Sequence, residues 1–379
     1  MHGYAGTITL VGEEVHPPYD KPPLSKQHLI TGTPVALVAP DDLAALDLDL
    51  RLGVRASALD PQARIVHLAD GGELSYATLV IATGVRPRTL PGAESIAGVH
   101  TIRTADDAAA LRAALAKQPR VVVVGGGFIG SEFASAAREF GCDVSIIEAQ
   151  PTPMAAVLGP RVGAALSELH RLNGVNLRTG VSFDHFELTA SGAVAGVVCS
   201  DGSSLPAELV VVGIGAVPAT EWLASSGLPL DNGVACDDSL HVLGYDDIYA
   251  VGDVASWPHG LYGGRRLRIE HWTNANEHAA IVAAGLLGGP LPAPQPPYVW
   301  SDQYGHRIQI IGRPADGELV SLAGAVEDHL TAVFAAPDGV VVGGVAVDDP
   351  RMLMTLRKAI LKGQPASEVP TGQAGAGRG

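Results

Sequence analysis

Cysteine is scarce in this sequence: the 379 residues include three, Cys142, Cys199 and Cys236, and no two of them form a CxxC pair. A redox-active dithiol in a short motif is therefore excluded, and the low cysteine content is typical of a reducing compartment. The 13 histidines form neither an HxH nor an HExxH pattern. We therefore expect no metal site.

Basic residues are also in the minority. There are 25 lysines and arginines against 40 aspartates and glutamates, which gives a formal net charge of −15. This balance argues against nucleic acid or a polybasic attachment to membranes. No basic segment followed by an apolar one marks a signal peptide near Met1, and no apolar run is long enough to span a bilayer. We expect a soluble, cytoplasmic protein.

Apolar residues, by contrast, are abundant. Hydrophobic residues make up 47% of the chain and charged residues 17%, so large cores can form. At about 150 residues per domain the length predicts two or three domains. Strand-like runs alternate with helical segments, and Arg120–Val124 followed by a helix over Ser131–Phe140 is the clearest example. The alternation predicts an α/β fold with a parallel, doubly wound sheet.

The C-terminal part has a different pattern. Residues 288–297 are rich in proline and glycine and predict a linker. Beyond them, alternating strands and a helix over Pro350–Lys362 predict a small α+β domain at residues 296–362. Residues 363–379 are rich in glycine, alanine and proline, which predicts a disordered tail.

A glycine motif, GGGFIG at residues 125–130, follows the Arg120–Val124 strand. Gly125 permits a tight turn, Gly127 lets a pyrophosphate approach the N-terminus of the next helix, and Gly130 lets that helix pack on the strand. Ile129 belongs to the same turn. The strand–turn–helix context predicts that Gly125, Gly127, Ile129 and Gly130 bind a dinucleotide.

A second strand of this unit ends at Glu148, 18 residues after Gly130. This spacing is near the one expected for an acid that accepts hydrogen bonds from a ribose 2′-hydroxyl. No arginine occurs at residues 149–151, although Arg161 lies further on. Glu148 should also repel a 2′-phosphate, so the sequence favours NADH over NADPH.

Six further segments carry a family resemblance. Three strands that run into glycine turns resemble the two-dinucleotide-domain flavoproteins, namely ATGVRPR at 82–88, VGIGAVP at 212–218 and IYAVGDVA at 248–255. Three more segments resemble the FAD-dependent NADH–ferredoxin reductases of the putidaredoxin and rubredoxin reductase type, namely YDKPPLSK at 19–26, EHWTNA at 270–275 and YVWSDQY at 298–304. These motifs stand in the family's order from about residue 6 to residue 362.

The resemblance implies two Rossmann-like dinucleotide-binding domains followed by the C-terminal α+β domain. Residues 1–103 and 231–295 would bind FAD, and residues 104–230 would bind NAD. The function implied is electron transfer from NADH through FAD to a two-iron, two-sulfur ferredoxin that supplies an oxygenase. In such enzymes the cofactors carry the chemistry, and the protein supplies orientation and electrostatics.

The resemblance also implies residue roles. Lys26 would lie beside the flavin N5 and pair with Glu132, and Trp272 would lie near the flavin edge, so these three are the catalytic candidates. Asp253 would bind the ribityl and pyrophosphate region of FAD. The other residues assigned to cofactor binding are Glu14 (or Glu13) for the adenosine ribose, Pro23 in the loop at the flavin, and Ala82, Thr83, Gly84, Arg88, Gly215 and Gly252.

The sequence departs from the family at two places. Ala219 follows Pro218, where the family commonly has asparagine. The family also opens with a strand, a GxGxxG turn and a helix that bind the FAD pyrophosphate, whereas residues 7–11 correspond to its second strand. We therefore expect the chain as given to bind FAD poorly, and the functional protein to start further upstream.

Other interpretations remain open. NADH oxidases, peroxidases and disulfide reductases share the fold, but those that use a cysteine carry it in the N-terminal flavin region, and none here precedes Cys142. A flavin-free NAD-binding remnant without catalysis is the alternative from a different class. For an acidic ferredoxin partner, the cluster Arg265, Arg266 and Arg268 is the expected docking patch.

Overall fold

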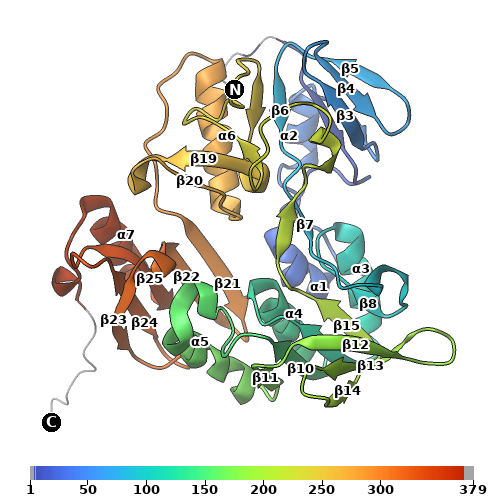
Figure 1. The fold of residues 1–379 in the computed structure, drawn as a ribbon, viewed down its shortest axis with the longest axis vertical. Coiled ribbons are helices and arrows are strands. Elements are labelled where there is room, and N and C mark those ends of the chain that lie inside the picture. The colour runs from blue at the N-terminus through green and yellow to red at the C-terminus, as the bar shows by residue number, and fades with distance from the viewer. Residues whose placement is uncertain (1–3, 5, 371–379) are drawn as a thin grey trace. The chain divides into compact units, whose positions relative to one another are not determined.

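The computed structural model describes residue 4 and residues 6–370. The chain divides into two compact units, shown in Figure 1 by their elements. The first unit holds residues up to 22 together with 34–86 and 216–295. The second holds residues 23–33 and 87–215 and the chain from 296 onward.

The first unit is built from short sheets around a shared apolar core. Its parallel pairs are β1 (Thr9–Gly12) with β2 (Asp49–Leu52) and β6 (Leu79–Ile81) with β18 (Ile248–Ala250). Among the described residues, β1 and β6 each pair along one edge. The core includes Leu240, Ile248 and Trp257, and helix α6 (Trp272–Leu286) contributes Ile281.

The remaining elements of this unit form three small sheets and short helices. The antiparallel sheet is β3 (Ala56–Asp60), β4 (Ile65–Leu68) and β5 (Glu73–Ser75). The mixed sheet is β17 (Val234–Ala235), β19 (Ala255–His259) and β20 (Arg265–Leu267). The two-stranded sheet is β7 (Val85–Pro87) with β16 (Ala216–Pro218). The helices are α2 (Pro40–Ala45) and the 3-10 turns Glu221–Leu223, Gly252–Val254 and Gly260–Tyr262.

The second unit contains the parallel, doubly wound sheet that the sequence predicts. Its strand order is β11-β10-β9-β15-β8, with β9 (Arg120–Val124) in the middle. The four valines of β9 are at most 4% exposed, as expected of a strand covered on both faces. The other strands are β8 (Val99–His100), β10 (Asp143–Glu148), β11 (Asn176–Thr179) and β15 (Leu209–Val212). The helices are α1 (Gln27–Thr31), α3 (Ala105–Leu115), α4 (Phe128–Glu139) and α5 (Ala155–Leu172).

A second five-stranded sheet in this unit is antiparallel, which agrees with the α+β pattern expected for the C-terminal part. Its order is β21 (Tyr298–Gln303), β22 (His306–Gly312), β25 (Val341–Val347), β24 (Thr331–Ala335) and β23 (Glu318–Ala323). Helix α7 (Pro350–Lys362) follows it. A core of Leu158, Leu166, Ile310 and Phe334 joins α5 to this sheet. The smaller elements are β12 (Phe183–Leu188), β13 (Val194–Cys199), β14 (Ser204–Pro206) and the 3-10 turns Pro22–Ser25, Ala93–Ser95, Pro314–Asp316 and Ala366–Glu368.

The disordered tail was predicted to begin too early. The main-chain N–H of Ala366 donates to Gly339, and a 3-10 turn follows over Ala366–Glu368. Val369 is 6% exposed and packs with Leu356, so one buried apolar side chain orders this segment. Residues 371–379 of the predicted tail lie outside the described residues.

The two compact units do not follow the domains that the sequence predicts. The chain passes between the units after residues 86 and 215, whereas the predicted boundaries lie at 103 and 230. Units defined by packing are not the same as cofactor-binding domains, so that assignment stays a prediction. Within the described residues, no helix combines the length and apolar character needed to cross a membrane.

Candidate functional site

The glycine turn after β9 has the close backbone contacts that its sequence predicts. Gly125 has a φ of 102°, and a Cβ there would overlap the carbonyl oxygen of Gly213. A Cβ on Gly130 would overlap the carbonyl oxygen of Gly125. A Cβ on Gly127 would meet nothing closer than 4.0 Å. Gly125 and Gly130 therefore shape the turn, whereas Gly127 leaves open space beside the helix.

Helix α4 begins at this open space. Gly127 is its N-cap residue, and no side chain caps the helix there. The first-turn N–H groups and the positive end of the helix dipole therefore face outward from the turn, an arrangement suited to a phosphate or pyrophosphate. Ile129 is 43% exposed on this first turn. The site thus fits the pyrophosphate of a dinucleotide, although the role of Ile129 stays a prediction.

Glu148 is held next to the same turn. Its Oε2 accepts the main-chain N–H of Gly126 at 2.8 Å, and its Oε1 accepts the N–H of Gln150 at 2.7 Å. Two backbone donors therefore fix this half-buried carboxylate at the end of β10. The negative charge lies next to the glycine turn, where the ribose-binding acid is expected.

The predicted ion pair between Lys26 and Glu132 is confirmed. Lys26 Nζ lies 2.8 Å from Glu132 Oε2, and the Glu132 residue is 3% exposed. Ser25 Oγ donates to the same Oε2 at 2.5 Å, and Ser301 Oγ donates to Oε1 at 2.6 Å. A buried carboxylate is costly unless it is paired and hydrogen-bonded, and here three donors serve it.

The two serines were missed from the sequence. Ser25 directly precedes Lys26, and Ser301 lies inside the YVWSDQY segment. The sequence motifs that contain these serines were identified. A serine in a strand, however, does not indicate that its hydroxyl bonds to Glu132, 169 residues away in the chain.

A second buried network on α4 was also missed. Ser131 Oγ donates to the carbonyl of Gly126 at 3.2 Å, and His170 Nε2 lies 3.2 Å from Ser131 Oγ. His170 Nδ1 lies 2.7 Å from the Tyr304 hydroxyl, and the Tyr304 main-chain N–H donates to Ser135 Oγ at 2.7 Å. Burial lowers the pKa of His170 to about 4 and raises the pKa of Tyr304. Neutral His170 therefore carries its proton on Nε2 and accepts the tyrosine proton on Nδ1.

In the first unit, Trp272 begins α6 and is 41% exposed. Its indole N–H donates to Asp20 Oδ1 at 3.1 Å. An indole that is exposed and held by a hydrogen bond is better suited to contact a ligand than to fill a core. The turn that contains Gly252 and Asp253 lies against the same helix, because a Cβ on Gly252 would be 3.4 Å from Ala275 Cβ.

The N-terminus of α6 also has no side-chain cap. The Gly252 N–H donates to Nδ1 of buried His278 at 3.1 Å, which fixes the turn. The uncapped helix end supplies N–H donors, the aspartate supplies an acceptor, and the exposed indole supplies a flat apolar surface. A flavin ring and its ribityl chain require these three features. The first unit therefore fits FAD at this place, and the roles of Gly252, Asp253 and Trp272 stay predictions.

Glu14 follows β1 and is already paired. Its Oε2 accepts the Tyr19 hydroxyl at 2.5 Å, and its Oε1 accepts Lys21 Nζ at 2.6 Å. Lys21 also lies 4.9 Å above the Tyr19 ring. Glu13 is exposed. Which of the two acids binds a ribose stays open.

The turn after β6 is tied to the strand that re-enters the first unit. Thr83 Oγ1 donates to the Ala219 carbonyl at 2.8 Å, and the Ala219 N–H donates to the Gly84 carbonyl at 2.9 Å. Ala219, where the family commonly has asparagine, is 4% exposed and needs no polar side chain for these bonds. Ala82 and Thr83 are exposed, so this turn has a free face toward solvent.

The remaining candidates lie in the second unit. The Arg88 N–H donates to the Gly215 carbonyl at 2.9 Å, and Gly215 has a φ of 93°. Pro23 lies in the 3-10 turn Pro22–Ser25 and its carbonyl accepts the Lys26 N–H at 3.0 Å. Pro23 thus shapes the approach to the ion pair. Contact of these residues with a cofactor stays a prediction.

The predicted arginine docking patch needs correction. Arg266 donates to two main-chain carbonyls, and the Arg268 side chain is 11% exposed and pairs with Glu270 at 2.6 Å. Both guanidinium groups therefore stabilise the first unit internally. Arg265 is exposed, with its guanidinium 6.0 Å from the centre of the Tyr262 ring. Arg265 is thus the exposed member of the three, and docking of a ferredoxin at this cluster stays a prediction.

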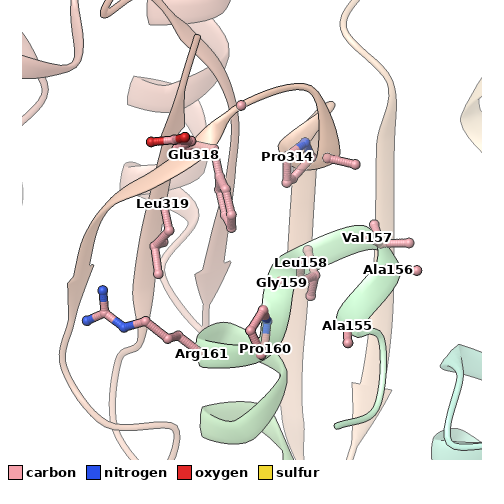
Figure 2. A pocket seen from close by; sticks show the side chains of 13 residues that line it. Ala155, Ala156, Val157, Leu158, Gly159, Pro160, Arg161, Pro314, Glu318 and Leu319 are labelled. Carbon is pink, nitrogen blue, oxygen red and sulfur yellow. The ribbon is translucent and has the colours of Figure 1, made fainter. Parts of the chain in front are cut away.

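A hollow of about 360 Å³ lies between α5 and the C-terminal sheet (Figure 2). Gly159, with a φ of 70°, and Pro160 kink α5 at its edge. Figure 2 shows Arg161 on the helix side and Glu318 on the strand side of the hollow. Arg161 is exposed and is one of the residues that line this hollow.

Comparisons with known proteins agree with this geometry. Residues 1–279 match the family described as pyridine nucleotide-disulphide oxidoreductase, and residues 298–374 match the reductase C-terminal family. Rhodocoxin reductase of Rhodococcus erythropolis is 37% identical, over 96% of this chain and 86% of its own length. The biphenyl dioxygenase system ferredoxin–NAD(+) reductase component of Paraburkholderia xenovorans (strain LB400) is also 37% identical, over 92% and 85%. The covalent putidaredoxin reductase–putidaredoxin complex aligns with a TM-score of 0.91 and 33% identity, over 96% of this chain and 89% of the matched chain.

Proposed function

The chain belongs to the pyridine nucleotide-disulphide oxidoreductase family, and from this membership we propose that it is an FAD-dependent NADH–ferredoxin reductase. It takes electrons from NADH and passes them to a two-iron, two-sulfur ferredoxin that supplies an oxygenase. The observation that carries the proposal is the ion pair of Lys26 with Glu132, a buried acid on the helix that begins at the dinucleotide turn. The similarity to ferredoxin–NAD(+) reductase components supports it.

NADH binds at the N-terminus of α4 in this proposal. The first-turn N–H groups beside Gly127 bind the pyrophosphate. Glu148 accepts hydrogen bonds from the ribose hydroxyls through the oxygen lone pairs that its two backbone donors leave free. The same charge excludes a 2′-phosphate, so NADH is preferred to NADPH.

FAD, when bound, accepts a pair of electrons and releases them singly, which the side chains alone cannot do. Asp253, the uncapped end of α6 and the indole of Trp272 would hold it in the first unit. Lys26 would supply a positive charge for the reaction. Glu132 holds the Lys26 ammonium in one place, because the two groups form an ion pair at 2.8 Å.

The ferredoxin partner must dock locally. A chain with a net charge of −15 repels an acidic protein at long range, so attraction depends on a short-range patch and falls with salt. We also place the protein in the cytoplasm, since its three cysteines are all free and buried.

The test uses the purified protein with FAD, NADH and a two-iron, two-sulfur ferredoxin, and follows cytochrome c reduction. The proposal expects reduction that requires both FAD and ferredoxin, with a higher kcat/KM for NADH than for NADPH. Rapid NADH consumption with oxygen as the acceptor, and no acceleration by ferredoxin, would instead identify an NADH oxidase. A protein that binds NADH but never flavin would identify a non-catalytic NAD-binding module.

A further inference from the structure

We propose that Ser301, on the C-terminal antiparallel sheet, is a positioning residue that sets the orientation of the Glu132 carboxylate and thereby holds Lys26 in place. This inference rests on the proposed function, because it concerns the charge that Lys26 presents to the flavin. Ser301 lies on β21, whereas Glu132 lies on α4 of the dinucleotide-binding half. The proposal therefore gives the C-terminal sheet a part in the chemistry.

The carboxylate has different partners on its two oxygens. Oε1 accepts the Ser301 hydroxyl at 2.6 Å, while Oε2 accepts both Lys26 Nζ at 2.8 Å and Ser25 Oγ at 2.5 Å. A carboxylate is planar, so a bond that fixes Oε1 also fixes the direction in which Oε2 points. Ser301 is thus the contact that turns the other oxygen toward Lys26.

The Ser301 hydroxyl has one orientation that satisfies its neighbours. Ser301 is fully buried, and Gln303 Nε2 donates to its Oγ at 3.0 Å. Since Gln303, which is 1% exposed, supplies the donor, the single hydroxyl proton of Ser301 is directed to Glu132. The chain of donors runs from Gln303 through Ser301 to the carboxylate.

The hairpin that carries Ser301 is fastened to α4 at its tip. Tyr304 and Gly305, with φ values of 52° and 84°, form the two-residue turn between β21 and β22. The Tyr304 N–H donates to Ser135, one helical turn after Glu132, and its hydroxyl reaches Ser131 through His170. With the tip held at these two points, Ser301 cannot move along α4, so its bond to Glu132 has a fixed geometry.

The experiment measures how fast Lys26 is labelled by an amine-reactive ester in the full chain as purified, at one fixed pH, with mass spectrometry to quantify the labelled peptide. In Ser301→Ala the carboxylate loses its Oε1 donor and no longer holds the Lys26 ammonium in one place, so labelling of Lys26 should be faster by about threefold or more. Ser301→Cys, which keeps a weaker donor, should fall between. Ser167→Ala removes a serine hydroxyl that bonds within α5, and it should leave the labelling rate unchanged.

A second readout links the contact to catalysis. With FAD bound, Ser301→Ala should lower the limiting rate of flavin reduction by NADH and leave the NADH concentration at half-maximal rate unchanged. An unchanged Lys26 labelling rate in folded Ser301→Ala overturns the proposal. If that variant does not fold, an unchanged labelling rate in Ser301→Cys overturns it. Labelling needs neither NADH nor ferredoxin, so a failed ferredoxin assay with faster labelling counts against the proposed function alone.

Discussion

Replacement of Glu148 tests how the chain selects NADH. The carboxylate is held by the N–H groups of Gly126 and Gln150, so its charge stays beside the dinucleotide turn whether or not a cofactor is bound. Glu148→Ala removes the charge and both acceptors, whereas Glu148→Gln removes the charge and keeps one acceptor oxygen. The pair of variants therefore separates repulsion of a 2′-phosphate from support of the turn.

The expected magnitude follows from the partial burial of this carboxylate. Two unit charges about 4 Å apart repel by about 1 kcal/mol in water and about 4 kcal/mol at an effective dielectric constant near 20. A half-buried site lies between these limits, which corresponds to discrimination between about fivefold and about a thousandfold. Both variants should therefore raise kcat/KM for NADPH by about tenfold or more. Glu148→Ala should also lose about tenfold with NADH, because ribose hydrogen bonds to a charged acceptor are worth about 1.5–3 kcal/mol.

The assay is steady-state reduction of ferredoxin or of a dye acceptor, with kcat/KM measured for both nucleotides at one ionic strength. Glu139→Ala is the matched control, since it removes an exposed carboxylate at the other end of α4, about 16 Å along the helix axis from the first turn. A ratio of NADH to NADPH that stays the same in both Glu148 variants would refute the assignment of this residue as the selecting charge.

Three other predictions follow from burial and backbone geometry. The pKa of His170 is lowered to about 4 in the folded chain, so on acidification the unfolded chain binds a proton at this residue before the folded chain does. The free energy of unfolding should therefore fall by about 2 kcal/mol between pH 6.5 and 5. Urea titration would detect this loss, and His170→Asn should reduce it. Leu166→Ala should cost about 2–5 kcal/mol of unfolding free energy by denaturant titration, since Leu166 is 1% exposed, whereas Leu172→Ala, at a residue 43% exposed, should cost far less. Gly127→Ala should keep the wild-type melting temperature and weaken NADH binding, as measured by calorimetry. Gly130→Ala should lower the melting temperature, because its Cβ would overlap a carbonyl oxygen. Equal melting temperatures for the two variants would contradict this prediction.

The part of the site that sequence could predict is the part encoded locally. The run of valines in β9, the glycines after it and Glu148 lie within one strand–helix–strand unit, so spacing alone placed them. The pairing of Lys26 with Glu132 came from the family resemblance, since the two residues are far apart in the chain.

The serines around Glu132 could not be predicted in the same way. Their contacts join residues 107 and 169 positions apart, and a hydroxyl has no periodic pattern that reveals its partner. The arginine cluster failed for a related reason. The sequence shows that a residue is charged, but not whether main-chain carbonyls near it accept its hydrogen bonds. Arg266 donates to two such carbonyls.

The exposed indole of Trp272 gives the chain an optical reporter. Of the four tryptophans, Trp257 is 4% exposed, and Trp222 and Trp300 are half-buried, while Trp272 is 41% exposed. A small neutral quencher should therefore reach Trp272 first, and Asp20→Ala should increase its mobility and lower its fluorescence anisotropy. Excitation energy passes readily from an indole to a nearby flavin, so the emission of this residue can follow cofactor loading in solution without any acceptor protein or added label.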